Sequence, residues 1–122
     1  MNFLLVFIGG GLGAVLRYGI GILWPQHNIW TSTLLANLVA ALIIGALYAW
    51  QPITKTTISS TLWMFLAIGF CGGLSTFSTF SLEIFQWMQL EKWGQCLAYI
   101  ALNVVLCTLL IFTCVKLLGA LK

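Results

Sequence analysis

The sequence predicts an all-α membrane protein with four transmembrane helices, the third of them broken within the membrane. Composition and the length of the apolar runs lead to this prediction. Of 122 residues, 61% are hydrophobic and 6% are charged, whereas about 25% of the residues in a soluble domain are charged. A soluble fold of this length has too small an interior to hide so much apolar surface, so its surroundings must be lipid.

Four apolar runs are long enough to cross a bilayer, which takes roughly 20 residues of helix. They cover residues 3–23, 31–50, 62–90 and 95–118. Near their expected ends lie all six tryptophans, as an interfacial aromatic belt requires: Trp24, Trp30, Trp50, Trp63, Trp87 and Trp93. The first run lacks a charged leader and an A-x-A site and contains Arg17, so we expect a membrane helix and not a cleaved signal peptide.

The segments between the runs are too short to fold into a soluble domain. The longest extends from Gln51 to Thr61, so we expect no enzyme. The four cysteines have neither CxxC nor Cys/His metal spacing, which favours buried free thiols. We expect the partners to be the bilayer and an ion, and no nucleic acid.

The positive charges are almost evenly divided between the two sides of the membrane. With four spans, Lys55, Lys116 and Lys122 lie on one side, and Arg17 and Lys92 on the other. Three against two is hardly a bias, and a Lys/Arg bias is what orients a membrane protein. We therefore expect insertion in both orientations and an antiparallel homodimer with its axis in the membrane plane, a symmetry that many transporters build into one chain. The alternative is one weakly determined topology.

The third run is too long for one straight span. As continuous helix, residues 62–90 would extend about 43 Å at 1.5 Å per residue. We expect a break within 72–76, near Gly72-Gly73, because glycine disfavours helix by about 1 kcal/mol relative to alanine. Irregular backbone at membrane depth occurs only where protein buries it or a polar cavity meets it. Its freed carbonyls can coordinate a cation and its freed N–H groups can face an anion, so the break predicts an ion site.

Hydroxyls and two phenylalanines follow this break. If helix resumes there, Phe77 and Phe80 share one face, and Ser75, Ser78 and Thr79 line an adjacent face. Hydroxyls can donate to an anion, and the edge of an aromatic ring is positive. A cation would prefer the ring face, so the pattern suits a small anion. The alternative is that the hydroxyls only hold membrane helices together; their density beside the glycines favours the anion site.

Four other polar groups lie within the runs. Asn37 needs a hydrogen-bond partner in hydrocarbon, so it either joins two helices through a hydrogen bond or forms part of a pore. Tyr99, Asn103 and Cys107 form a stripe on one helix face, which we expect to face protein or water.

Two charged groups also lie at membrane depth. Arg17 either snorkels to the interface or stands at an anion entrance. Glu83 must be hydrogen-bonded or protonated there, and an acid at that depth is by default a functional hypothesis.

Three stretches match one known pattern. The first run contains GGGLGAVLRYG, the second STLLANLVAALIIG and the third GFCGGLSTFSTFSLE, which is close to GG-x-(S/T)-TFSTFS-x-E. Over essentially its whole length, the chain thereby resembles the CrcB/Fluc family of small bacterial fluoride channels.

The resemblance implies a dual-topology antiparallel homodimer in the plasma or inner membrane. It implies two pores that pass fluoride down its gradient and so protect the cell from fluoride toxicity. It also implies a structural Na⁺ at the dimer centre, held by the backbone carbonyls of Gly72 and Ser75.

The resemblance further assigns roles to individual side chains. Phe77 and Phe80 match the pair whose ring edges face fluoride, and Asn37 matches the pore asparagine. The remaining matches are a hydroxyl-rich track at Ser78, Thr79 and Ser81, the fourth-helix tyrosine at Tyr99, and the accessory positions Arg17 and Glu83. The chain departs from the family pattern after Asn37, where Leu-Val-Ala-Ala-Leu follows, and at Asn103 and Cys107, where serine-like donors are expected.

Two other classes of protein share some of these features. A small multidrug or guanidinium exporter also has four spans and dual topology. It exchanges protons through a carboxylate expected in the first span, which here has no Asp or Glu, and Glu83 is the only other candidate. A scaffold subunit would carry no ions and would tolerate Phe77→Ile.

Overall fold

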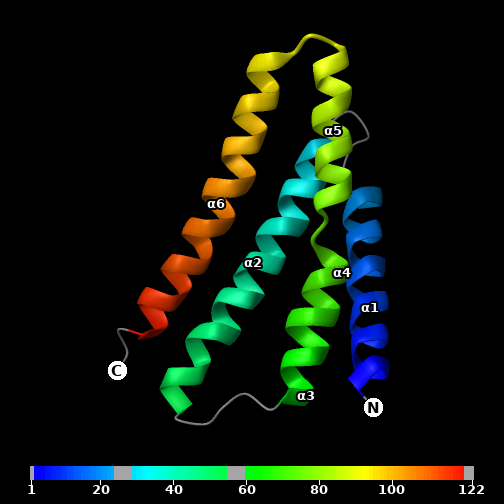
Figure 1. Ribbon diagram of the computed structural model, residues 1–122. Coiled ribbons are helices and arrows are strands. Elements are labelled where there is room, and N and C mark those ends of the chain that lie inside the picture. The colour runs from blue at the N-terminus through cyan, green and yellow to red at the C-terminus, as the bar shows by residue number, and fades with distance from the viewer. Residues whose placement is uncertain (1, 24–28, 55–59, 120–122) are drawn as a thin grey trace.

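The computed structural model describes residues 2–23, 29–54 and 60–119 (Figure 1). The described residues form helices and short connections between them, which confirms the all-helical prediction for these ranges. The α-helices are α1 (Asn2–Leu23), α2 (Ile29–Thr54), α3 (Ser60–Trp63), α4 (Gly72–Leu74), α5 (Phe77–Gln89) and α6 (Trp93–Gly119). Between α3 and α4 lies a π-helix, η2 (Met64–Cys71). Trp24, Lys55 and Lys122, which entered the tryptophan and charge arguments above, lie outside these ranges.

Within the described residues, four segments are long and apolar enough to cross a membrane. They are Asn2–Leu23, Trp30–Trp50, Thr61–Gln89 and Trp93–Leu118. The third combines α3, η2, α4 and α5, which follow one another in Figure 1 with a short non-helical step between α4 and α5. The chain is a multi-pass membrane protein.

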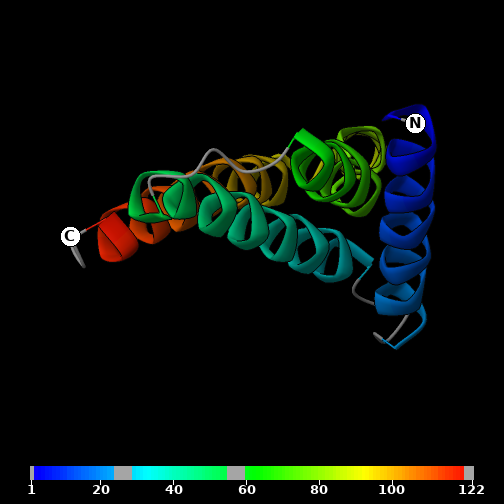
Figure 2. The same ribbon diagram turned by 90° about the horizontal axis from the view of Figure 1, so that it is seen from below.

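The helices form an open arrangement. α2 packs against α6, and α1 packs against η2 and α4. Seen from below, α1 lies at one end and α6 reaches the other (Figure 2). Only 11% of the span in α1, and 11% of the span in α6, is buried within the chain. These outer helices therefore need lipid or another chain against them.

The third span is interrupted at Ser75 and Thr76, within the predicted interval. Both residues have extended backbone, with ψ of 151° and 119°. The expectation that Gly72-Gly73 themselves break the helix is wrong, because both are helical. Gly73 instead permits close packing: a Cβ there would collide with the carbonyl oxygen of Gly10 in α1.

Serine and threonine end one helix and begin the next. The N–H and the hydroxyl of Ser75 both donate to the Cys71 carbonyl, at 2.9 and 2.8 Å, and so close the last turn. Thr76 is the N-cap of α5, and its Oγ1 accepts from the N–H of Thr79 at 3.2 Å. Threonine is a favoured N-cap residue because its oxygen satisfies an otherwise unpaired helix N–H. The break is therefore encoded by the Ser-Thr pair.

Candidate functional site

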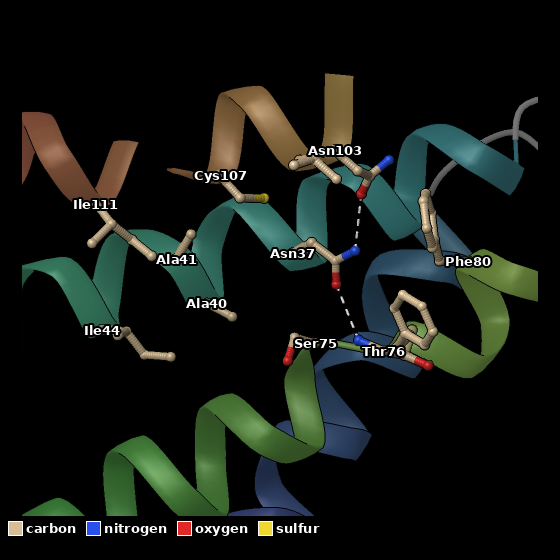
Figure 3. A pocket seen from close by; sticks show the side chains of 12 residues that line it. Asn37, Ala40, Ala41, Ile44, Ser75, Thr76, Phe80, Asn103, Cys107 and Ile111 are labelled. Carbon is tan, nitrogen blue, oxygen red and sulfur yellow. Dashed lines mark hydrogen bonds between the residues drawn. The ribbon is translucent and has the colours of Figure 1, made fainter. Parts of the chain in front are cut away.

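A cavity of about 310 Å³ lies beside the break, between α2, α6 and the start of α5. Its polar and aromatic lining comes from Asn37, Ser75, Thr76, Phe77, Phe80 and Asn103, several of which Figure 3 shows converging from three segments. The rest of the wall is small or apolar: Ala40, Ala41, Ile44, Val104, Cys107 and Ile111. The sequence left open whether Asn103 and Cys107 line such a space, and both do.

The amide of Asn37 is held from two sides. Its Oδ1 accepts from the backbone N–H of Thr76 at 3.0 Å, and its Nδ2 donates to Oδ1 of Asn103 at 3.0 Å (Figure 3). Asn103 in turn donates through Nδ2 to the carbonyl of Tyr99 at 3.2 Å. Asn37 therefore both joins helices and faces a cavity, so the two alternatives left open by its sequence are not exclusive.

The bond from Thr76 also changes the backbone at the break. In an uninterrupted helix, the N–H of Thr76 would donate to the carbonyl of Gly72. It donates to Asn37 instead, so the Gly72 carbonyl loses its helical donor. Gly72 is exposed, and Ser75 is extended, so its carbonyl also departs from the helical direction.

The two phenylalanines lie side by side at the cavity. Their ring centroids are 5.8 Å apart, and both rings line the space. Phe80 is 7% exposed and lies 5.2 Å from the Tyr99 ring, whereas Phe77 is 80% exposed. One ring is thus held within this chain, and the other has a free face.

The predicted donors beyond the rings are only partly brought to the cavity. Ser75 lines it, whereas Ser78, Thr79, Ser81 and Tyr99 are absent from its lining. Ser81 donates to the carbonyl of Phe77 at 2.8 Å, and the buried Tyr99 donates its hydroxyl to Glu83 at 2.6 Å. In this structure those two hydroxyl protons are already engaged.

The remaining hydroxyls form a small network around Thr76. Its hydroxyl donates to Oγ1 of Thr79 at 3.1 Å and lies 3.2 Å from Oγ of Ser78. Arg17, from α1, donates to Oγ1 of Thr79 at 3.5 Å. The Nε of Arg17 is buried without a partner among the described residues, and Arg17 does not line the cavity. The guanidinium thus contacts the hydroxyl network at Thr79, which is not part of the cavity lining.

Glu83 joins three helices. Its carboxyl group is buried and accepts from Thr33 of α2 at 2.7 Å and from Tyr99 of α6 at 2.6 Å. Each oxygen of the carboxyl group therefore accepts one short hydrogen bond from a hydroxyl group. A carboxyl group at membrane depth needs such partners because a buried polar group without them is costly.

A second cavity, of about 420 Å³, is lined in part by Tyr99. Trp30, Trp87 and Tyr99 line it together with Lys92 and Gln95. The three rings contact one another edge to face, with centroids 5.2 to 6.2 Å apart. Lys92 therefore lies beside an aromatic wall at the α5–α6 end of the molecule.

Sequence reasoning passed over two residues of this site. Thr76 connects the break, Asn37 and the hydroxyl network, and Thr33 holds Glu83. A signal existed for each: Thr76 lies at the end of the predicted break, where an N-cap residue would stand, and Thr33 precedes Asn37 by one helical turn on the same face.

Known proteins share most of this sequence. A family profile described as "CrcB-like protein, Camphor Resistance (CrcB)" matches residues 4–115. A protein of Klebsiella pneumoniae (strain 342) is 44% identical over 103 residues, which cover 82% of this chain and 80% of that one. A protein of Pyrococcus abyssi (strain GE5 / Orsay) is 43% identical over 110 residues, covering 89% of each chain. Both are named fluoride-specific ion channel FluC. By the extent of these matches, the chain belongs to the CrcB-like protein family.

Proposed function

We propose that the protein is a fluoride-selective channel that passes fluoride down its electrochemical gradient and so lowers fluoride in the cell. The observation that carries the proposal is the cavity at the break, which Asn37 lines together with the paired rings of Phe77 and Phe80. The family membership supports the same conclusion, since similar proteins are named for fluoride.

The chemistry of the cavity suits a small, strongly hydrated anion. Amide N–H groups replace water as donors, and ring edges add a weak positive potential without a full charge. Neither lysine nor arginine is among the lining residues. Because a channel must release the ion it binds, several modest donors serve conduction better than one strong cationic site.

We further propose an antiparallel homodimer. The cavity reaches the surface of the chain, because Phe77 is 80% exposed, so a second copy would complete its wall. The near-equal division of lysine and arginine supports insertion in both orientations. The plasma membrane, or the inner membrane where there are two, is the proposed location.

A sodium ion at the dimer centre is part of this proposal. The residues present fit it: the Gly72 carbonyl has lost its helical donor to Asn37, Gly72 is exposed, and Ser75 is extended. Backbone carbonyls are hard oxygen ligands of the kind that hold Na⁺ at broken membrane helices. The ion would supply positive charge that holds the two breaks together.

Efflux from liposomes tests the function directly. Purified protein is reconstituted, and loss of fluoride and of chloride is followed under a potential clamped with potassium. Rapid fluoride loss, without chloride loss and without a proton gradient, is the expected result. Absence of fluoride flux from protein shown by cross-linking to be dimeric would overturn the proposal.

The exporter class is the second candidate in this test. It needs a carboxylate free to exchange protons, but α1 contains no Asp or Glu, and Glu83 is buried and bonded to two hydroxyls. Flux of guanidinium that depends on a proton gradient would favour the exporter.

A further inference from the structure

The two asparagines beside the cavity form one directed chain of hydrogen bonds. It runs from the Thr76 N–H to Oδ1 of Asn37, from Nδ2 of Asn37 to Oδ1 of Asn103, and from Nδ2 of Asn103 to the Tyr99 carbonyl. The three bonds measure 3.0, 3.0 and 3.2 Å. The chain crosses the cavity wall from the helix break, through α2, to α6 (Figure 3).

The backbone groups at its two ends decide how both amides are turned. A backbone N–H can only donate, so the atom of Asn37 that faces Thr76 must be the oxygen. A backbone carbonyl can only accept, so the atom of Asn103 that faces Tyr99 must be the nitrogen. These two requirements agree at the middle bond, where nitrogen meets oxygen. Turning either amide over would break two bonds at once.

We propose that Asn103 is a positioning residue that holds the Asn37 amide with its nitrogen toward the cavity. The proposal rests on the proposed function, in which Asn37 donates to fluoride. One proton of Asn37 Nδ2 is bonded to Asn103, and the other has no partner among the described residues although Asn37 lines the cavity. That second proton is the donor that an anion meets, and Asn103 fixes its direction.

The environment of Asn103 suits such a role. The side chain is 6% exposed, and a buried amide without its partners is costly. Asn103 directs its oxygen at Nδ2 of Asn37 and donates one N–H to the Tyr99 carbonyl of its own helix. It is therefore fixed by its own helix and can in turn fix the direction of the Asn37 amide.

Asn103→Leu removes both bonds at nearly constant volume. Loss of the bond to Asn37 should raise the half-saturating fluoride concentration of efflux about threefold to tenfold, which lies within the range that one hydrogen bond accounts for. Asn103→Ser, which can still accept from Asn37 and donate to the Tyr99 carbonyl, should recover part of the loss. Val105→Ala is the matched control, since Val105 lies on the same turns of α6 and lines neither cavity.

A double-mutant cycle separates positioning from a general packing effect. In an Asn37→Ser background, Asn103→Leu should change the half-saturating concentration less than twofold, because the amide that it orients is gone. The same threefold to tenfold change in both backgrounds would overturn the proposal.

A readout independent of conduction completes the test. The sequence has four asparagines, so selective ¹⁵N labelling yields four side-chain amides, and Asn37→Ser identifies one pair. One Asn37 amide proton should exchange slowly with deuterium in the natural protein and rapidly in Asn103→Leu. If the natural protein passes no fluoride but shows this exchange pattern, the channel function fails and the positioning stands. If fluoride passes and exchange is the same in both proteins, the positioning fails.

Discussion

The packing of α1 against η2 predicts different effects of alanine substitution at two glycines of α1. Gly13 is buried, and a Cβ there would collide with the Phe70 carbonyl oxygen and lie 2.7 Å from the Leu74 nitrogen. Gly11, half a turn away, has no atom within 4 Å of the position that a Cβ would take. Gly13→Ala should therefore push α1 away from the third span, whereas Gly11→Ala should not.

The expected loss of unfolding free energy follows from comparing the two variants. Either change gains about 1 kcal/mol of helix propensity, so that gain cancels in the difference between them. What remains is the overpacking at Gly13, about 1–3 kcal/mol. Its neighbours are backbone atoms and cannot turn aside as a flexible side chain would.

The assay is unfolding in mixed micelles with increasing SDS, followed by tryptophan fluorescence. Gly13→Ala should unfold at lower SDS than the natural protein, and Gly11→Ala at equal or higher SDS. Equal stability of the two variants would refute the close approach of α1. Because α1 also carries Arg17, which contacts Thr79, loss of packing should be accompanied by slower fluoride efflux.

The other predictions concern the site. Phe80→Ile should reduce fluoride efflux at least tenfold while cross-linking still shows the dimer, and unchanged efflux from both Phe80→Ile and Phe77→Ile would contradict the ring-edge role. Asn37→Asp should block efflux by placing a like charge in the path; normal efflux would remove Asn37 from the pore. Tyr99→Phe should lower the unfolding free energy by about 1–3 kcal/mol, the cost of leaving a buried polar group without its partner, because Glu83 loses a buried donor at 2.6 Å. A loss under about 0.5 kcal/mol, the lower end for any hydrogen bond, would argue against that bond. Replacing sodium by N-methylglucamine should lower the thermal stability of the dimer, and no change would count against the sodium site.

The fold was largely predictable because a membrane-spanning helix requires only a long enough run of apolar residues and not a particular order of side chains. Apolar runs of sufficient length become helices whatever packs beside them, since the backbone has no other partner in hydrocarbon. The residues of the break were harder to predict. Glycine and an N-cap threonine both signal a helix end, and only the packing of Gly73 against Gly10 shows that here the glycine serves close approach.

The site was predictable by residue type but not by the direction of its bonds. Phe77 and Phe80 could be proposed from their spacing and Asn37 from the resemblance to the family, and all three line the cavity. The sequence does not show that Tyr99 and Ser81, unlike these three residues, lie outside the cavity lining. A hydroxyl donates to an acceptor that is near in three dimensions, and the order of residues does not reveal which one that is. Their nearest acceptors are Glu83 and a helix carbonyl, and neither contact has a signature in the linear sequence.

One backbone N–H links the features that a channel of this kind needs. Because Thr76 donates to Asn37, the helix is interrupted, the Gly72 carbonyl is released and the oxygen of Asn37 is turned away from the anion. A helix continued through residue 76 would reclaim that N–H for Gly72 and leave the Asn37 oxygen unpaired. The proposed cation site and the proposed anion donor therefore depend on the same hydrogen bond. A substitution that disrupts this bond should weaken both sites. The hydroxyl of Thr76 adds the N-cap of α5, which explains why the backbone can give up a helical bond here at small cost.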